Sequence, residues 1–176
     1  MNRIEVRRAS KRDIDAIVPL WREMMELHQE IEPANWTMAP DADEIFRSYL
    51  AQCLDDPEHM IAVAVSAGEL VGFIHASRAY RPPVVTPQAQ GAVNGIGVTA
   101  NARRQGIGRM LVEEAMRWFR GQGLAVAKAG WAAANPLSAP FWIAQGFRPY
   151  QVTGLRPVGP DDAQGPRSES PRNEKG

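Results

Sequence analysis

The residues with the clearest chemical potential form a short basic run with two glycines, Arg103-Arg104-Gln105-Gly106-Ile107-Gly108. An amphipathic segment follows it directly. The first N–H groups of a helix have no partner within the helix, and the helix dipole places about half a positive charge at that end. Glycines let an anion approach these N–H groups, and guanidinium groups pair with phosphate oxygens. We therefore interpret the run as a pyrophosphate-binding turn.

Two elements must position this turn. Before it, the apolar residues 92–98 predict a strand. After it, apolar side chains recur with the helical period and predict a long helix that ends near two glycines. The inward stripe of this helix is Ile107, Leu111, Ala115 and Trp118. A Gly-x-Gly sequence before a helix is often only a tight turn, so the interpretation depends on the rest of the chain.

Further strands are predicted from short apolar or alternating segments at residues 4–7, 60–65, 70–77, 124–131 and 147–153. With the helices between them, they predict an α/β (α+β) fold. Its sheet is mixed and mostly antiparallel, with helices on both faces. The strands on either side of the long helix should be parallel, because a helical crossover joins parallel strands.

The other helices have recognisable ends. The first is predicted to start at Ser10, with Asp13 as its capping-box partner, and Pro19 should kink or split it. A second helix should begin near Asp41 or Asp43 and end at Pro57, and a short third one should be capped by Asn135. Residues 31–40 and 78–90 contain several prolines and are predicted to be loops.

Composition limits the classes of function. The 176 residues contain 20 Lys plus Arg and 20 Asp plus Glu, and this zero net charge argues against nucleic acid as a ligand. No segment approaches the roughly 20 apolar residues of a membrane span, so no membrane partner and a cytoplasmic location are expected. The single cysteine, Cys53, excludes an internal disulfide and is predicted to be a buried, inert thiol. No metal site is predicted.

Residues 95–100 match Gly-x-Gly-x-x-Ala, which is similar to a dinucleotide-binding fingerprint. That fingerprint must open a helix directly after its first glycine. Here the apolar strand continues to Val98, so a bulge or a close backbone approach explains the glycines better. A nicotinamide-dependent oxidoreductase would depend on this match alone.

Taken together, the motifs resemble those of the GNAT superfamily, the Gcn5-related N-acetyltransferases. The hallmark (Arg or Gln)-x-x-Gly-x-(Gly or Ala) corresponds to residues 103–108, and the preceding strand end corresponds to Ile96-Gly97-Val98. A second motif corresponds to Asn135, Ser138-Ala139, Phe141-Trp142 and Gly146-Phe147. The resemblance spans about residues 3–152. It implies one acetyltransferase domain at residues 1–153 with splayed central strands, and the Pro- and Gly-rich residues 154–176 are predicted to be a disordered tail.

The resemblance implies acetyl-CoA (coenzyme A) as cofactor. Backbone amides of the turn would hold the pyrophosphate, and the strand would hold the pantetheine arm as an added strand. The implied cofactor-binding residues are Ile96, Gly97, Val98, Arg103, Arg104, Gln105, Gly106, Ile107, Gly108, Arg109, Asn135, Ser138 and Trp142. For Asn135, a simple helix cap is the competing interpretation.

Two catalytic groups common in the family are missing. Residues 94–97 hold no carboxylate where many members carry a glutamate base, and Trp142 stands where many carry a tyrosine acid. His75 and Tyr80 are the candidate replacements. Because general acid–base help typically contributes about 10²–10⁴-fold, its loss should slow transfer rather than abolish it. Side chains at the end of the first helical region could contact an acceptor: Glu26, His28, Glu30 and Trp36.

The resulting hypothesis is an acetyl-CoA-dependent N-acetyltransferase. Its acceptor would be a primary amine of a small molecule or peptide, which attacks the thioester directly. The alternative is a catalytically weak or inactive GNAT-fold module that binds acyl-CoA and regulates. Homodimerisation is expected only by analogy, because dimers are common in the family.

Overall fold

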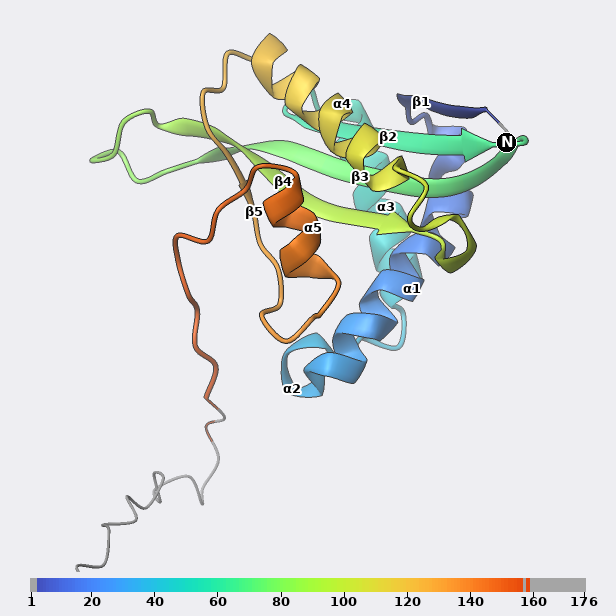
Figure 1. Cartoon of the computed structure of the whole chain (residues 1–176), viewed down its shortest axis with the longest axis horizontal. Coiled ribbons are helices and arrows are strands. Elements are labelled where there is room, and N and C mark those ends of the chain that lie inside the picture. The colour runs from blue at the N-terminus through green and yellow to red at the C-terminus, as the bar shows by residue number, and fades with distance from the viewer. Residues whose placement is uncertain (1–2, 157, 159–176) are drawn as a thin grey trace, which may run out of the picture.

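The structure, a computed structural model, describes residues 3–156 and 158. Five strands form one sheet in the order β1-β2-β3-β4-β5 (Figure 1). Their bounds are β1 Ile4–Arg8, β2 His59–Ser66, β3 Glu69–Tyr80, β4 Ala89–Val98 and β5 Ala127–Ala129. Neighbouring strands are antiparallel except for β4 and β5, which are parallel. The predicted mixed sheet with one parallel pair is confirmed.

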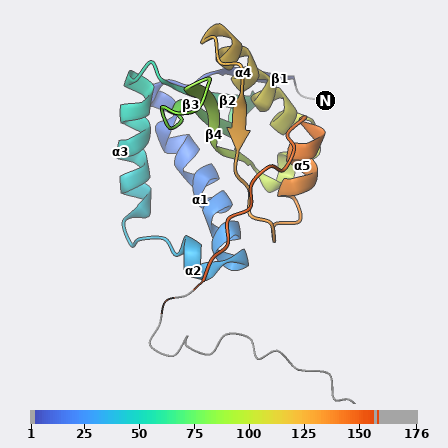
Figure 2. The same cartoon turned by 90° about the vertical axis from the view of Figure 1, so that its left-hand side faces the viewer.

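Helices cover both faces of this sheet. Figure 2 shows α1 and α3 on one side and α4 on the other. The helix bounds are α1 Ile14–Ile31, α2 Pro33–Trp36, α3 Ala42–Asp55, α4 Ile107–Gly121 and α5 Ser138–Ala144, with short 3-10 turns η1 Lys11–Asp13 and η2 Ala100–Ala102.

Alternation along the strands divides the core into two parts. Beneath α4, the fully buried Ile74 packs against Ile107 and Leu111. On the opposite face, Phe73 packs with residues of α1 and α3, including Ile17 and Leu50. The predicted inward stripe of α4 is therefore confirmed for Ile107, Leu111 and Ala115, while Trp118 is only partly buried.

Some predicted boundaries are wrong. Residues 147–153 form no strand: they pair with none of the five strands, and most of their side chains are exposed. Pro19 does not split α1, since it lies on the exposed side and removes only one backbone hydrogen bond. The loop predicted at 31–40 contains α2. The loop predicted at 78–90 is confirmed for residues 81–88, while its two ends belong to β3 and β4.

Two further predictions concern the C-terminal tail and membrane crossing. Most of the tail predicted at 154–176 lies outside the described residues. Among the helices of the described part, none combines the length and the apolar character that a membrane crossing requires.

Candidate functional site

The turn before α4 presents a row of N–H groups without partners. Across the described residues, no backbone or side-chain acceptor bonds the N–H groups of residues 104–109, and Met110 N–H is the first bonded one, to the Gly106 carbonyl oxygen at 3.1 Å. Arg104 and Gly106 have positive φ angles, 61° and 80°. These left-handed residues shape the turn, and the row of N–H groups at a helix N-terminus is suited to an anion.

The two glycines of the turn have different reasons to be glycine. A Cβ atom at Gly106 would meet no heavy atom within 4 Å, so space is open beside its N–H group. A Cβ atom at Gly108 would lie 2.8 Å from Phe141 Cε2. Gly108 is thus required by the packing of α5 against α4, whereas Gly106 combines a left-handed backbone with an open approach. The turn fits a diphosphate group at its Gly106 side.

Strand β4 has a bulge next to the point where β5 leaves it. His75 pairs with Gly95, and Ala76 pairs with Val93, so Asn94 is the extra residue. Strand β5 pairs only with residues 91–93 of β4. Residues 94–98 therefore have β3 on one side and, within the described part of the chain, no strand on the other, which is the splay implied by the family resemblance.

The backbone N–H and C=O groups of successive β4 residues point alternately toward β3 and toward this gap. Thr99 N–H bonds the Val71 carbonyl oxygen of β3 at 3.0 Å. Because directions alternate along a strand, Gly97 also faces β3, while Ile96 and Val98 face away from it. The Val98 carbonyl oxygen accepts from Arg103 Nε at 3.0 Å, and Arg103 Nη2 lies 2.6 Å from Glu23 Oε1 of α1.

Gly97 has a packing role. A Cβ atom there would lie 2.7 Å from Phe73 Cε1 and 3.2 Å from the Leu20 carbonyl oxygen. At Gly95, a Cβ atom would make ordinary contacts with Met24 Cε at 3.7 Å. Helix α1 therefore lies directly over the bulge, which would form one wall of any acceptor site.

The second motif forms a turn and the short helix α5. Asn135 is buried, and its Oδ1 accepts from Leu137 N–H at 3.0 Å, two residues on and before the helix begins at Ser138. Trp142 is also buried, with its ring 5.0 Å from that of Phe141 and 5.1 Å from that of Phe147. Both side chains serve the packing of α5, and their contact with a cofactor stays a prediction.

The two candidate catalytic residues lie in different places. His75 is 3% exposed and its Nε2 lies 2.9 Å from His59 Nδ1. Burial, with a smaller contribution from His59, lowers the pKa of His75 to about 4. Tyr80 is exposed and bonds Glu58 at 2.5 Å. It pairs with the first residue of β4, roughly 30 Å along the strand from Val98.

Sequence reasoning missed one grouping in this region. His59 and Cys53 lie next to His75, although none of the three spacings resembles a known ligand motif. The residues with a predicted acceptor role, in contrast, stay near the end of α1. There His28 and Trp36 pack with ring centroids 5.1 Å apart, and Glu26 lies 3.9 Å from Arg22.

A family profile identifies the chain. The profile of the acetyltransferase (GNAT) family matches residues 21–147. The chain therefore belongs to this family of acetyltransferases, and acetyl-CoA is its acetyl donor. Comparison with curated proteins by sequence gave no significant match.

Solved structures share the fold. A variant of the BH1408 protein from Bacillus halodurans has a TM-score of 0.76 at 16% identity, covering 88% of this chain and 99% of that chain. A predicted acetyltransferase from Clostridium acetobutylicum, solved with acetyl-CoA, has a TM-score of 0.72 at 16% identity, over 88% and 96%. The aminoglycoside antibiotic 6'-N-acetyltransferase AAC(6')-IG from Acinetobacter haemolyticus has a TM-score of 0.70 at 17% identity, over 89% and 99%.

Proposed function

We propose that this protein transfers an acetyl group from acetyl-CoA to a primary amine of a small molecule or a peptide by direct attack. The row of unpartnered N–H groups at residues 104–109, beside the splay of β4 and β5, is the observation that carries the proposal. An amine acceptor is also supported by the fold shared with an aminoglycoside acetyltransferase.

The turn and β4 bind different parts of acetyl-CoA. The N–H groups of residues 104–109 bind the diphosphate, and Arg104 adds positive charge, whereas the Arg103 guanidinium is paired with Glu23. Ile96 and Val98 offer main-chain groups to the pantetheine arm, because they face the gap that β5 leaves. When bound, acetyl-CoA supplies the thioester that the amine attacks.

Orientation and hydrogen bonding account for the chemistry that this chain supplies. N–H groups facing the gap can donate to the developing oxyanion, and α1 holds the acceptor over the bulge. Neither candidate base is well placed, because His75 is buried against His59 and Tyr80 lies at the far end of β3. The amine must therefore arrive uncharged, and less than about 0.1% of a lysine-like amine is uncharged at pH 7.

This mechanism predicts how the rate of transfer depends on pH. Without a protein base, kcat/KM should rise about tenfold per pH unit until the pKa of the acceptor amine is reached. The profile is measured with two amines of different pKa, and the plateau should move with the amine. A plateau at one fixed pH for both amines would indicate a base on the protein.

Two glycines that flank α4 allow a matched test of the binding turn. Gly106 and Gly123 have similar positive φ angles, 80° and 68°, and a Cβ atom at either meets nothing within 4 Å. Gly106→Ala and Gly123→Ala should therefore cost similar stability, about 1–2 kcal/mol each. Only Gly106→Ala should weaken acetyl-CoA binding, by about tenfold or more, as measured by calorimetry.

Transfer itself is tested with an amine panel and a free-thiol assay. Release of CoA that depends on one or more amines supports the proposal. Tight acetyl-CoA binding without release to any amine would favour the regulatory alternative, and equal affinity of the two glycine variants would remove the turn from the donor site.

A further inference from the structure

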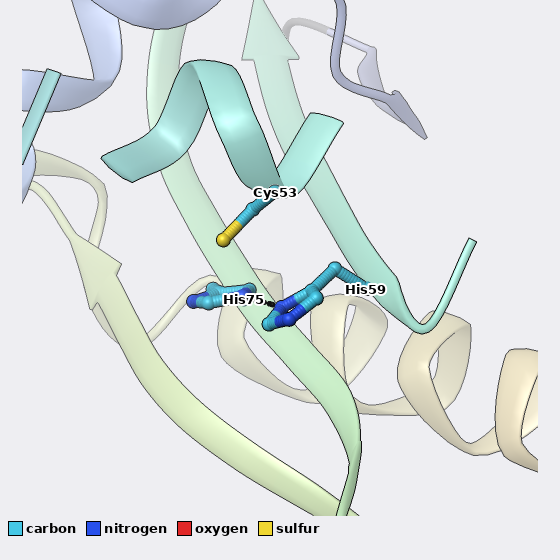
Figure 3. A group of neighbouring side chains, drawn as sticks. All are labelled: Cys53, His59 and His75. Atoms are coloured by element: carbon cyan, nitrogen blue, oxygen red, sulfur yellow. Dashed lines mark hydrogen bonds between the residues drawn. The ribbon is translucent and has the colours of Figure 1, made fainter. Parts of the chain in front are cut away.

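A group of three side chains outside the proposed acetyl-transfer mechanism lies between α3 and the sheet. Cys53 is at the end of α3, His59 is the first residue of β2, and His75 is in the middle of β3 (Figure 3). One donor atom from each residue lies within 4.8 Å of the others. His59 Nδ1 and His75 Nε2 are 2.9 Å apart, and the Cys53 sulfur points toward both rings.

The types of donor decide what such a group can bind. A thiolate and two imidazoles suit Zn²⁺ and similar transition metals, whereas Mg²⁺ and Ca²⁺ prefer oxygen. In a tetrahedral zinc site these donors would be roughly 3.3–3.6 Å apart, given Zn–N near 2.0–2.1 Å and Zn–S near 2.3 Å. The two nitrogens, 2.9 Å apart, would have to separate slightly, and the Cys53 sulfur lies no more than 4.8 Å from either ring donor. Side-chain rotations would bring the three donors into place.

One neighbouring residue, Asp56, supports a metal site, and another, Asn94, competes with the metal for a histidine nitrogen. Asp56 Oδ2 lies 3.9 Å from His59 Nε2, the ring nitrogen that faces away from His75. At 3.9 Å this carboxylate is beyond hydrogen-bond distance, but a small side-chain movement would let it accept from Nε2 and leave Nδ1 free for a metal. Asn94 Nδ2, however, lies 3.4 Å from His75 Nε2, and its stronger contact is with Ser77 Oγ at 2.9 Å.

An aromatic ring shields the group. Tyr49, one helical turn before Cys53, has its ring edge-on to both imidazoles, with centroids 5.6 Å from His75 and 6.4 Å from His59. His75 and Cys53 are buried, while the His59 side chain is 22% exposed. An ion would enter beside His59 and would then be largely shielded from water.

We propose that Cys53, His59 and His75 form a Zn²⁺ site, with Asp56 as a positioning residue and a water molecule as the fourth ligand. Three protein ligands plus water is a common zinc arrangement. The ligands belong to α3, β2 and β3, so the bound ion links the helix to two strands. Binding releases the thiol proton of Cys53 and breaks the hydrogen bond between the two histidines.

The test uses the full chain, freed of metal by a chelator and titrated with Zn²⁺ alone or Co²⁺ alone. We expect one Zn²⁺ per chain, a higher melting temperature with Zn²⁺, and a thiolate-to-metal absorption band with Co²⁺. Cys53→Ser should abolish that band. His59→Gln and His75→Gln should each weaken Zn²⁺ binding more than about 100-fold, and Asp56→Asn by about 10–100-fold.

The third histidine of the chain provides a matched control. His28 lies on α1, where Nδ1 contacts the Met24 carbonyl oxygen, so His28→Gln should leave Zn²⁺ affinity unchanged. If the His75→Gln variant does not fold, the Co²⁺ spectrum of the wild type and the Zn²⁺ affinity of the His59→Gln variant still test the proposal. Absence of saturable Zn²⁺ binding, a Co²⁺ spectrum without a thiolate band, or equal losses in His28→Gln and His59→Gln would overturn the proposal.

Discussion

Two helical regions of this protein begin in opposite ways. At the start of α1, the Asp13 carboxylate accepts from Arg7 at 2.7 and 2.9 Å, from Ser10 N–H at 2.7 Å and from the Ser10 hydroxyl at 2.9 Å. At the start of α4, the N–H groups of residues 104–109 have no partner within the described part of the chain. The first start contains its own anion, and the second lacks one.

The comparison separates a helix start that the chain itself stabilises from one whose N–H groups are left open. Both starts have arginines nearby, and both have N–H groups that need acceptors. The predicted capping box of Ser10 and Asp13 is confirmed, and the Asp13 carboxylate also accepts from the Ser10 hydroxyl. A carboxylate from the chain stabilises the fold at α1, whereas the open row at α4 is where we propose that acetyl-CoA places its diphosphate.

The largest expected effect breaks the satisfied start. Asp13→Ala should lower the free energy of unfolding by about 3 kcal/mol, because the donors of Arg7 and Ser10 lose a largely buried acceptor. Asp15→Ala is the matched control. Asp15 pairs with Arg47 in an exposed bridge and should cost less than about 1 kcal/mol. Urea unfolding measures both, and equal costs would contradict the comparison.

Acid should weaken the same start. Hydrogen bonds from Arg7, followed by those from Ser10, hold the pKa of Asp13 well below its usual range. Because this pKa is depressed in the folded state, the stabilisation is complete above the unfolded value near 3.9 and is lost as pH falls below it. Between pH 5 and pH 2, wild type should lose about 1–2 kcal/mol more than Asp13→Asn. Parallel pH curves for the two proteins would argue against the assignment.

A third experiment gives the open start an anion of its own. Gln105→Asp places a carboxylate beside the unpartnered N–H groups, so acetyl-CoA affinity should fall about tenfold while stability rises by up to about 1 kcal/mol. Gln122→Asp, at the other end of α4, should lower stability slightly and leave affinity unchanged. Calorimetry and thermal unfolding separate the two outcomes. A Gln105→Asp protein with unaltered affinity would contradict the binding role of the turn.

The smallest effect concerns backbone strain. Arg104 and Ala67 are non-glycine residues with positive φ, 61° and 51°. Replacing either by glycine should raise stability by up to about 1 kcal/mol, because the left-handed strain is relieved. Arg104→Gly should also weaken acetyl-CoA binding a few-fold through loss of a cation, and Ala67→Gly should not. A similar affinity in both variants would show that the Arg104 charge does not act on the donor.

Local patterns predicted much of the fold and the conformation of the turn before α4. The turn before α4 was readable because helix capping and glycine conformation depend on neighbouring residues, and the strand before it has a continuous apolar run. The role of Gly108 could not be predicted from the sequence. Its contact is Phe141, far along the chain, and packing of that kind leaves no local signal.

The same limit applies to the errors. Residues 147–153 were predicted to be a strand from local sequence alone, but a strand also needs pairing, and these residues pair with no strand of the sheet. Cys53 was correctly predicted to be buried. Its proximity to His59 and His75 arises from α3 lying on the sheet, which the sequence spacing does not encode.

Hydrogen exchange at residues 104–109 tests the central claim most directly, because it follows the backbone amides themselves. Exchange is measured in the free protein, with CoA, and with pantetheine, which lacks the diphosphate. We predict that CoA slows exchange at these amides at least about tenfold, while pantetheine at saturating concentration leaves them unchanged. Unchanged exchange with bound CoA, or equal slowing by pantetheine, would contradict the claim that these N–H groups hold the diphosphate.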